Sequence, residues 1–221
     1  MLLAPLRRLG VSRSFGFARH ASSLAPIDSS KMVVTKTDSP KALPELDGLG
    51  FGKVFTDHMM ICDWDSKTGW HTPTIVPYGP MAISPAASSL HYALQCFEGM
   101  KAYKNEAGEA LLFRPDMNMK RFERSMGRLH MPGFDHEQLL DCIKQLVRME
   151  DRWIPERDGY SLYLRPTAIS THPFVGVAAP EQVRVFTILS PVGPYYPEGF
   201  KPVTLFADQE NRRAWPGMLL L

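Results

Sequence analysis

The chain has 221 residues, a hydrophobic fraction of 44%, a charged fraction of 22% and a formal net charge of +2. This composition is typical of a soluble globular protein that is long enough to bury a core, in one or two domains. No apolar run approaches the roughly 18 residues that a membrane-spanning helix needs, so we expect no membrane association. The three cysteines form no C-x-x-C pair, which argues against a zinc ribbon or a redox dithiol and favours a reducing compartment.

The first 21 residues differ from the rest of the chain, because no acidic residue precedes Asp28. Their basic residues are Arg7, Arg8, Arg13 and Arg19. The pattern predicts a mitochondrial transit peptide over residues 1–21 and a location in the mitochondrial matrix; a disordered basic tail is the alternative. Removing four of the 25 basic residues leaves fewer of them than the 23 acidic ones, so we expect no nucleic acid partner.

The segment after the leader has low periodicity. Residues 22–50 are rich in Ser, Pro, Lys and Asp and are expected to form a flexible linker, with order beginning near Phe51. Residues 55–64 predict a strand, and the compact polar turn at 65–69 predicts a hairpin after it. A second short strand is expected at 81–84.

A helix is predicted to begin at Ser88. Leu90, Leu94 and Phe97 recur at i, i+4 and i+7, so that they share one apolar stripe on a helix. Gly99 follows this run and is expected to end the helix as a left-handed cap.

The middle of the chain predicts a hairpin and two helices. Residues 101–103 and 110–114 flank a turn signal at 105–108. A helix is expected over 118–129 with Asn118 as its N-cap. Its apolar side comprises Met119, Phe122, Met126 and Leu129, and its opposite side comprises Arg121, Arg124 and Arg128.

A second amphipathic helix begins at Asp135, and three strands are expected after it, at 161–168, 183–189 and 203–207. The apolar face of this helix comprises Leu139, Leu140, Ile143, Leu146 and Val147. Strands, then two helices, then strands again predict an α+β domain with a largely antiparallel sheet.

Most enzyme motifs are absent from the sequence. It contains no G-x-G-x-x-G, no G-x-x-x-x-G-K, no H-E-x-x-H and no G-x-S-x-G. The histidines lack ligand spacing, so we expect no metal site and interpret His58, His71, His91, His130 and His136 as surface or packing residues.

Aromatic and cationic residues remain as candidates for a site. In the strand around Tyr163, the period of two puts Tyr163 and Arg165 on one face and Leu162 and Leu164 on the other. That polar face is either a solvated sheet face or a pocket wall that offers a phenol and a guanidinium to a small carboxylate. Arg121 leaves a similar choice between a solvated helix face and a phosphate contact.

Five segments together resemble the branched-chain amino acid aminotransferases, specifically the mitochondrial vertebrate type, over about residues 51–215. They are residues 88–103, 112–115, 118–122, 161–166 and 191–193. The resemblance implies a pyridoxal phosphate enzyme of fold-type IV. It divides the chain into a smaller domain at 51–190, an interdomain linker at 191–202 and the start of a larger domain at 203–221.

The resemblance also implies an activity and a site. The activity is exchange of the amino group of Leu, Ile or Val with 2-oxoglutarate, in a homodimer with pyridoxal 5'-phosphate. By the same match, Arg121 and Arg213 contact the cofactor phosphate and Tyr163 contacts the substrate. The other matched positions are Phe51, Tyr92 and Phe97 in the pocket for the branched side chain, Arg165 beside Tyr163, and Val177 reaching toward the partner subunit's site.

The chain departs from the family after Arg213-Ala-Trp215. The family continues to a Gly-Asn-Tyr-Lys segment that supplies the Schiff-base lysine, whereas residues 216–221 read Pro-Gly-Met-Leu-Leu-Leu. No catalytic residue is therefore assigned, and the chain is expected to be inactive alone. Two alternatives stand beside this interpretation. One is a non-catalytic fragment that pairs with full-length subunits, and the other is a different fold-type IV enzyme, such as a D-amino acid aminotransferase or an aminodeoxychorismate lyase.

Overall fold

The computed structural model describes residues 24–196 and 201–208, and the predicted transit peptide at 1–21 and Arg213 lie outside them. The described part has three α-helices: α1 (Ser88–Tyr92), α2 (Pro115–Arg128) and α3 (His136–Met149). Two short 3-10 turns are η1 (Ser29–Lys31) and η2 (Asp151–Trp153). The strands are β1 (Val33–Val34), β2 (His58–Asp65), β3 (Gly69–Trp70), β4 (Thr74–Pro77), β5 (Gln95–Phe97), β6 (Met100–Lys104), β7 (Ala110–Leu112), β8 (Ser161–Ser170) and β9 (Gln182–Val192).

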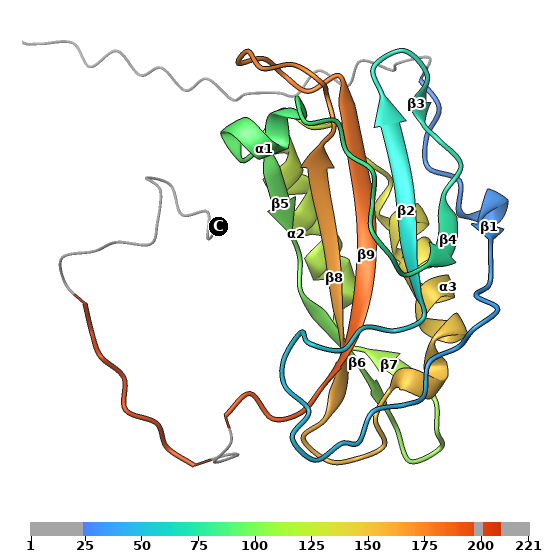
Figure 1. Ribbon diagram of the computed structural model, residues 1–221, viewed down its shortest axis with the longest axis vertical. Coiled ribbons are helices and arrows are strands. Elements are labelled where there is room, and N and C mark those ends of the chain that lie inside the picture. The colour runs from blue at the N-terminus through green and yellow to red at the C-terminus, as the bar shows by residue number, and fades with distance from the viewer. Residues whose placement is uncertain (1–23, 197–200, 209–221) are drawn as a thin grey trace, which may run out of the picture.

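These strands form one sheet in the order β1-β4-β2-β9-β8-β6-β7, with β3 paired to β2 and β5 paired to β8. The β1–β4 pair is parallel, and the other strand pairs of the described residues are antiparallel. Helices α2 and α3 lie against one face of the sheet (Figure 1). The predicted α+β class with a largely antiparallel sheet is confirmed.

The face of the sheet that meets α2 and α3, here called the core face, carries the apolar half of each strand. On β8, Leu162, Leu164 and Ala168 are fully buried. Their β9 neighbours Leu189 and Val185 pair with Leu164 and Ala168 and are equally buried. The opposite face, here called the outer face, carries the half-buried residues between them. Period-two alternation thus assigns the two faces as the sequence predicted.

The two long helices match their predicted cores. Met119, Phe122 and Met126 of α2 are fully buried, and the apolar face predicted for α3 is buried as well. Asp135 caps α3 as expected, because its carboxylate accepts hydrogen bonds from the amides of residues 137 and 138 at 2.9 and 3.1 Å. The predicted start of α2 was wrong. Pro115 occupies the first turn, where its fixed φ suits a helix and its missing N–H costs nothing.

The helix predicted from Ser88 is mostly a strand. Helix α1 ends at Tyr92, and Ala93 at φ 52° is the left-handed residue in place of the expected Gly99. The chain then forms β5, in which Phe97 pairs with Thr167 of β8. The predicted apolar stripe is exposed at both ends, 62% at Leu90 and 53% at Phe97. Pairing with the long strand β8 satisfies backbone groups that a further helical turn would otherwise have satisfied.

The segment expected as a flexible linker, residues 22–50, packs on the domain over part of its length. Ile27 is 2% exposed and belongs to the hydrophobic core. The amide and hydroxyl of Ser29 donate to Gln138 Oε1 of α3 at 2.8 and 2.9 Å. Strand β1 then extends the sheet beside β4. These long-range contacts have no local sequence period, which explains why the pattern alone missed them.

A buried polar network continues this attachment. The carboxylate of Asp57, which is 5% exposed, accepts hydrogen bonds from the Lys41 amide at 2.9 Å, from Arg152 Nη2 at 2.6 Å and from Trp153 Nε1 at 3.2 Å. Burial alone would raise the pKa of Asp57, but these three hydrogen bonds outweigh it and lower the pKa below 3.8. The network therefore ties the N-terminal segment to η2 through an ionised carboxylate.

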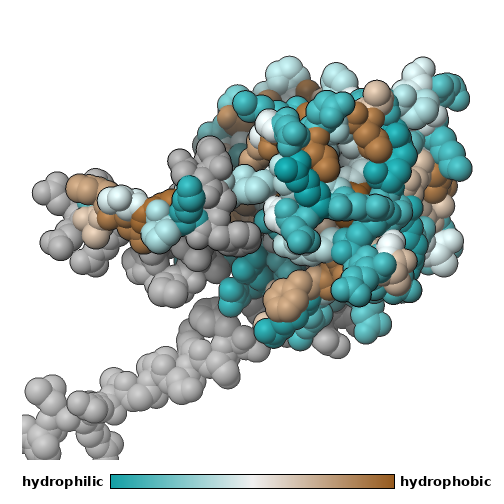
Figure 2. Space-filling view, turned by 90° about the horizontal axis from the view of Figure 1, so that it is seen from below, coloured by the Kyte–Doolittle hydropathy of each residue, from teal (hydrophilic) through white to brown (hydrophobic). Residues whose placement is uncertain are grey.

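Three smaller predictions also need correction. Residues 81–84 form no strand, and the strand after the first hairpin is β4. Strand β9 continues to Val192, into the start of the predicted linker at 191–202. Residues 203–207 are not a strand in the described segment 201–208, where Phe206 is 93% exposed. Seen from below, teal predominates on the body of the molecule, while brown side chains gather on that projecting segment (Figure 2).

Candidate functional site

Strand β8 presents two polar groups on the outer face. Tyr163 and Arg165 are half-buried there, while Leu162 and Leu164 point into the core. Arg165 Nε donates a hydrogen bond to the phenol oxygen of Tyr163 at 3.0 Å. The predicted alternation and the predicted proximity of this pair are thus both seen in the structure. A phenol and a guanidinium held together in this way offer donors to an anionic group.

Two phenylalanines complete this group. The ring of Phe51 meets the ring of Tyr163 edge to face, with centroids 4.8 Å apart. The guanidinium of Arg165 lies 4.1 Å from the centroid of Phe97 and 5.2 Å from that of Tyr163. We call Phe51, Phe97, Tyr163 and Arg165 the outer-face cluster. It joins three segments that are far apart in the sequence into one surface with apolar walls and a cationic centre.

Gly99 allows this surface to form. A Cβ atom at Gly99 would overlap the phenol oxygen of Tyr163 and lie 3.1 Å from Tyr163 Cζ. The requirement is therefore for space beside the Tyr163 ring and not for a left-handed backbone, which Gly99 does not adopt.

Arg121 reaches the same region through a second group, here called the Arg121–Glu98 pair. Arg121 donates to the Glu98 carboxylate through Nε and, at 2.7 Å, through Nη2. Asn118 Nδ2 donates to Glu98 Oε2 at 2.9 Å and to the carbonyl oxygen of Gly99 at 3.1 Å. Hydrogen bonding to Glu98 raises the pKa of Arg121 and outweighs the opposing effect of desolvation. Gly99 is therefore the link between this pair and the outer-face cluster.

The two remaining predicted residues lie at another end of the structure. Tyr92 of α1 donates a hydrogen bond from its phenol to the carbonyl oxygen of Val175. Val177 is 87% exposed. The amide of Ser88 donates to the carbonyl oxygen of His172 at 3.0 Å, which holds α1 against the loop that contains these residues. Whether Tyr92 lines a substrate pocket and Val177 reaches a partner subunit stays a prediction.

Sequence reasoning missed Glu98, Asn118 and Ser190. Asn118 was interpreted as a helix cap, and Glu98 was hidden inside the predicted helix. Ser190 pairs with Tyr163 and faces the same side, and its buried hydroxyl has no hydrogen-bond partner within residues 24–196 and 201–208. An acidic residue directly before the required glycine was the available signal for Glu98.

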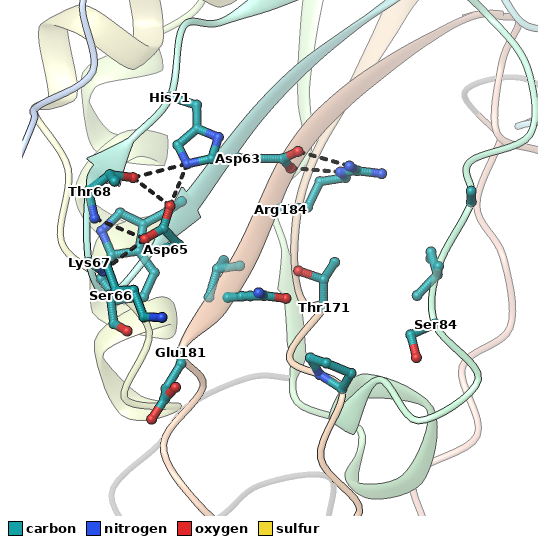
Figure 3. Close-up of a pocket in the computed structure, with 16 residues that line it drawn as sticks. Asp63, Asp65, Ser66, Lys67, Thr68, His71, Ser84, Thr171, Glu181 and Arg184 are labelled. Carbon is teal, nitrogen blue, oxygen red and sulfur yellow. Dashed lines mark hydrogen bonds and ion pairs between the residues drawn. The ribbon is translucent and has the colours of Figure 1, made fainter.

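A pocket of about 600 Å³ lies elsewhere, and none of the predicted site residues lines it. Figure 3 shows its polar walls, with Arg184 facing Asp63 and the Asp65 turn beside His71. Arg184 Nε and Nη2 bind Asp63 at 2.7 and 2.8 Å. The Asp65 carboxylate accepts hydrogen bonds from Thr68 and His71, which hold its pKa well below its usual range. Because these charges already satisfy one another, the outer-face cluster is the better candidate site.

Other classes of site have little support in the described part of the chain. No group of three or more His, Cys, Asp or Glu residues there is arranged to hold a metal ion. No helix among the described residues is long and apolar enough to cross a membrane.

Comparisons with known proteins agree with the sequence pattern. The chain is 48% identical over 200 residues to a branched-chain-amino-acid aminotransferase of Dictyostelium discoideum, covering 90% of this chain and 53% of that protein. It is 45% identical over 210 residues to the cytosolic enzyme of Mus musculus, covering 94% of this chain and 54% of that protein. The chain is a homologue of the branched-chain amino acid aminotransferases.

This homology has a defined extent. The chain spans about half the length of the curated relatives it matches. A mitochondrial enzyme of Schizosaccharomyces pombe is 47% identical over 192 residues, covering 87% of this chain and 45% of that enzyme, so mitochondrial and cytosolic relatives are similarly close. No family model matches. A crystal structure of a bacterial-type branched-chain amino acid aminotransferase with pyridoxamine 5'-phosphate is 30% identical, with a TM-score of 0.41, over 57% of this chain and 38% of that one.

Proposed function

We propose that this chain forms one wall of the cofactor and substrate site of a pyridoxal phosphate-dependent transaminase. The substrates are Leu, Ile or Val and 2-oxoglutarate, and the products are branched 2-oxo acids and glutamate. The observation that carries the proposal is the convergence of Phe51, Phe97, Tyr163 and Arg165, from three separate segments, on one face of a chain that is 45–48% identical to branched-chain aminotransferases.

The donor set of Arg121 fits the phosphate of the cofactor. Its side chain is 57% exposed, and its Nε and Nη2 already bind Glu98, so the remaining N–H groups of Nη1 and Nη2 point away from that carboxylate. Guanidinium groups bind phosphate oxygens through such pairs of N–H donors. When bound, pyridoxal phosphate supplies an aldehyde for the amino group and a ring that withdraws electrons. Arg213, the second predicted phosphate contact, belongs to the same proposal.

The outer-face cluster fits the substrate. The rings of Phe51 and Phe97 are 46% and 53% exposed, so they offer apolar surface to a branched side chain. Arg165 uses Nε for Tyr163 and retains its Nη groups for a carboxylate. In this arrangement the cluster binds and orients the substrate, and Tyr92 extends the apolar wall.

The same proposal includes a homodimer. Apolar side chains are exposed around α1 and the loop at 174–177, and monomers rarely leave such groups uncovered. They are Leu90, Phe174, Val175 and Val177, at 62%, 45%, 57% and 87% exposure. We expect sedimentation velocity of the purified chain to show a dimer, and Val175→Asp to shift it toward the monomer. Association through this surface with longer subunits of the family is the second outcome, and co-purification of tagged copies detects it.

We also propose location in the mitochondrial matrix, on the basis of the acid-free, arginine-containing segment 1–21. Import into isolated mitochondria, followed by protection from added protease, tests it. Replacing the four arginines of this segment with glutamine is expected to abolish import. Import that persists without them would contradict the proposal.

The function itself is tested by comparing pyridoxal 5'-phosphate with pyridoxal, which lacks the phosphate. Titration calorimetry of the 221-residue chain is expected to show tighter binding of the phosphorylated form. Arg121→Gln should remove most of that difference, whereas Arg124→Gln, an exposed arginine on the same helix, should leave it unchanged. Equal binding of the two compounds by the wild-type chain would contradict the proposal. Amino transfer from leucine to 2-oxoglutarate is measured on the product of the complete transcript.

A further inference from the structure

Glu98 is a carboxylate buried at the point where β5 turns into β6. It is 3% exposed, although it lies between the sheet and the solvent-facing side chain of Arg121. Its amide donates to the carbonyl oxygen of Pro166 in β8 at 2.8 Å, which fixes its backbone beside the outer-face cluster. Its Oε2 accepts hydrogen bonds from Asn118 Nδ2 at 2.9 Å and from the Gly99 amide at 3.2 Å. The carboxylate is thus held in one place before Arg121 is considered.

Arg121 takes its orientation from this carboxylate. A long side chain on a helix surface, 57% exposed, samples many rotamers when nothing holds it. Glu98 binds two nitrogens of one edge of the guanidinium, Nε and Nη2, and a planar group held at two points cannot rotate about its axis. The opposite edge, which carries Nη1, is the edge that remains for a ligand.

We propose that Glu98 is the positioning residue of the phosphate contact, holding one edge of the Arg121 guanidinium so that the other edge meets the phosphate of pyridoxal phosphate. This inference rests on the proposed function. Removing the carboxylate has two opposite effects: it releases the guanidinium, and it removes a negative charge near the phosphate. Because Arg121 separates the two anions and its outer edge is solvated, screening weakens their repulsion, and loss of orientation dominates.

The test compares Glu98→Gln with the wild-type chain and with Glu123→Gln as a matched control. Glu123 is also on α2, where its carboxylate binds His136 Nε2 at 2.7 Å and does not contact Arg121. For each protein, the affinity for pyridoxal 5'-phosphate is divided by the affinity for pyridoxal, which isolates the contribution of the phosphate. We expect Glu98→Gln to reduce this ratio about tenfold, the lower end of the effect of residues that orient a ligand's direct contacts. Glu123→Gln should leave the ratio unchanged.

A second measurement needs no variant to fold. In the wild-type chain, the Nε–H signal of Arg121 in a nitrogen-15 NMR spectrum should be separate from those of exposed arginines and slow to exchange with water. An averaged signal would overturn the inference. So would an unchanged or higher ratio in a folded Glu98→Gln variant, and in that case tight binding of pyridoxal phosphate by the wild-type chain would leave the proposed function intact. If the wild-type chain fails to distinguish the two compounds, the proposed function falls and this inference falls with it.

Discussion

The two faces of β8 differ in what they contribute to the molecule. On the core face, Leu162 and Leu164 are completely buried against the neighbouring strands and helices. On the outer face, Tyr163 and Arg165 remain half-buried and contact each other and the aromatic rings of Phe51 and Phe97. One strand therefore supplies stability through one set of residues and a candidate binding surface through the other. The comparison teaches that stability and ligand binding should respond to different substitutions only one residue apart.

The largest effect is expected from Leu164→Ala on the core face. Deleting a fully buried leucine side chain removes transfer free energy and leaves a cavity, so the free energy of unfolding should fall by about 2–5 kcal/mol. Tyr163→Phe on the outer face removes one partly buried hydrogen bond and should cost less than about 1.5 kcal/mol. Urea denaturation followed by circular dichroism measures both. Equal losses would show that the two faces do not divide the tasks.

A smaller effect is expected from Asp57→Asn, which tests how firmly the N-terminal segment belongs to the core side of the molecule. Because the folded-state pKa of Asp57 is lowered, its stabilisation is present above the ordinary value of 3.8 and is lost as pH falls below it. The variant should lose about 1–3 kcal/mol at neutral pH, because hydrogen bonds to a buried charge are weakened.

Denaturation curves between about pH 7 and pH 3 check the sign of this effect. The difference between wild type and Asp57→Asn should shrink as the carboxylate becomes protonated. A difference that stays constant with pH would mean that Asp57 acts through shape alone.

The smallest effect concerns the buried thiols of Cys62, Cys96 and Cys142. Burial raises the pKa of each to about 12 from 9.0, so the thiols stay protonated near neutral pH and should react slowly with a disulfide reagent. Because the raised pKa favours the folded state fully only below the ordinary value of 9.0, this small stabilisation should disappear as pH rises toward about 12. Reaction rates in native buffer and in urea provide the measurement. Fast reaction of any thiol in the native protein would show that its burial is incomplete.

Prediction from the sequence succeeded where one local pattern had one structural solution. The cap and apolar face of α3 and the alternation along β8 belong to this class. It failed at residues 88–99, because apolar residues at i, i+4 and i+7 lie on one side of a helix but also occur in a short strand beside a turn. It also failed at Ile27 and Asp57, whose partners lie far along the chain.

The sequence by itself determined the family resemblance, the α+β class, and the presence of Tyr163 and Arg165 on one face of a strand. These follow from ordered segments and from the period of two, which are local properties of the chain. The tertiary structure decided that Phe97 is on a strand beside Arg165, that Gly99 provides space for Tyr163, and that Glu98 holds Arg121. The physical reason is that strand pairing and buried ion pairs depend on partners distant in the sequence, and only the fold brings these together.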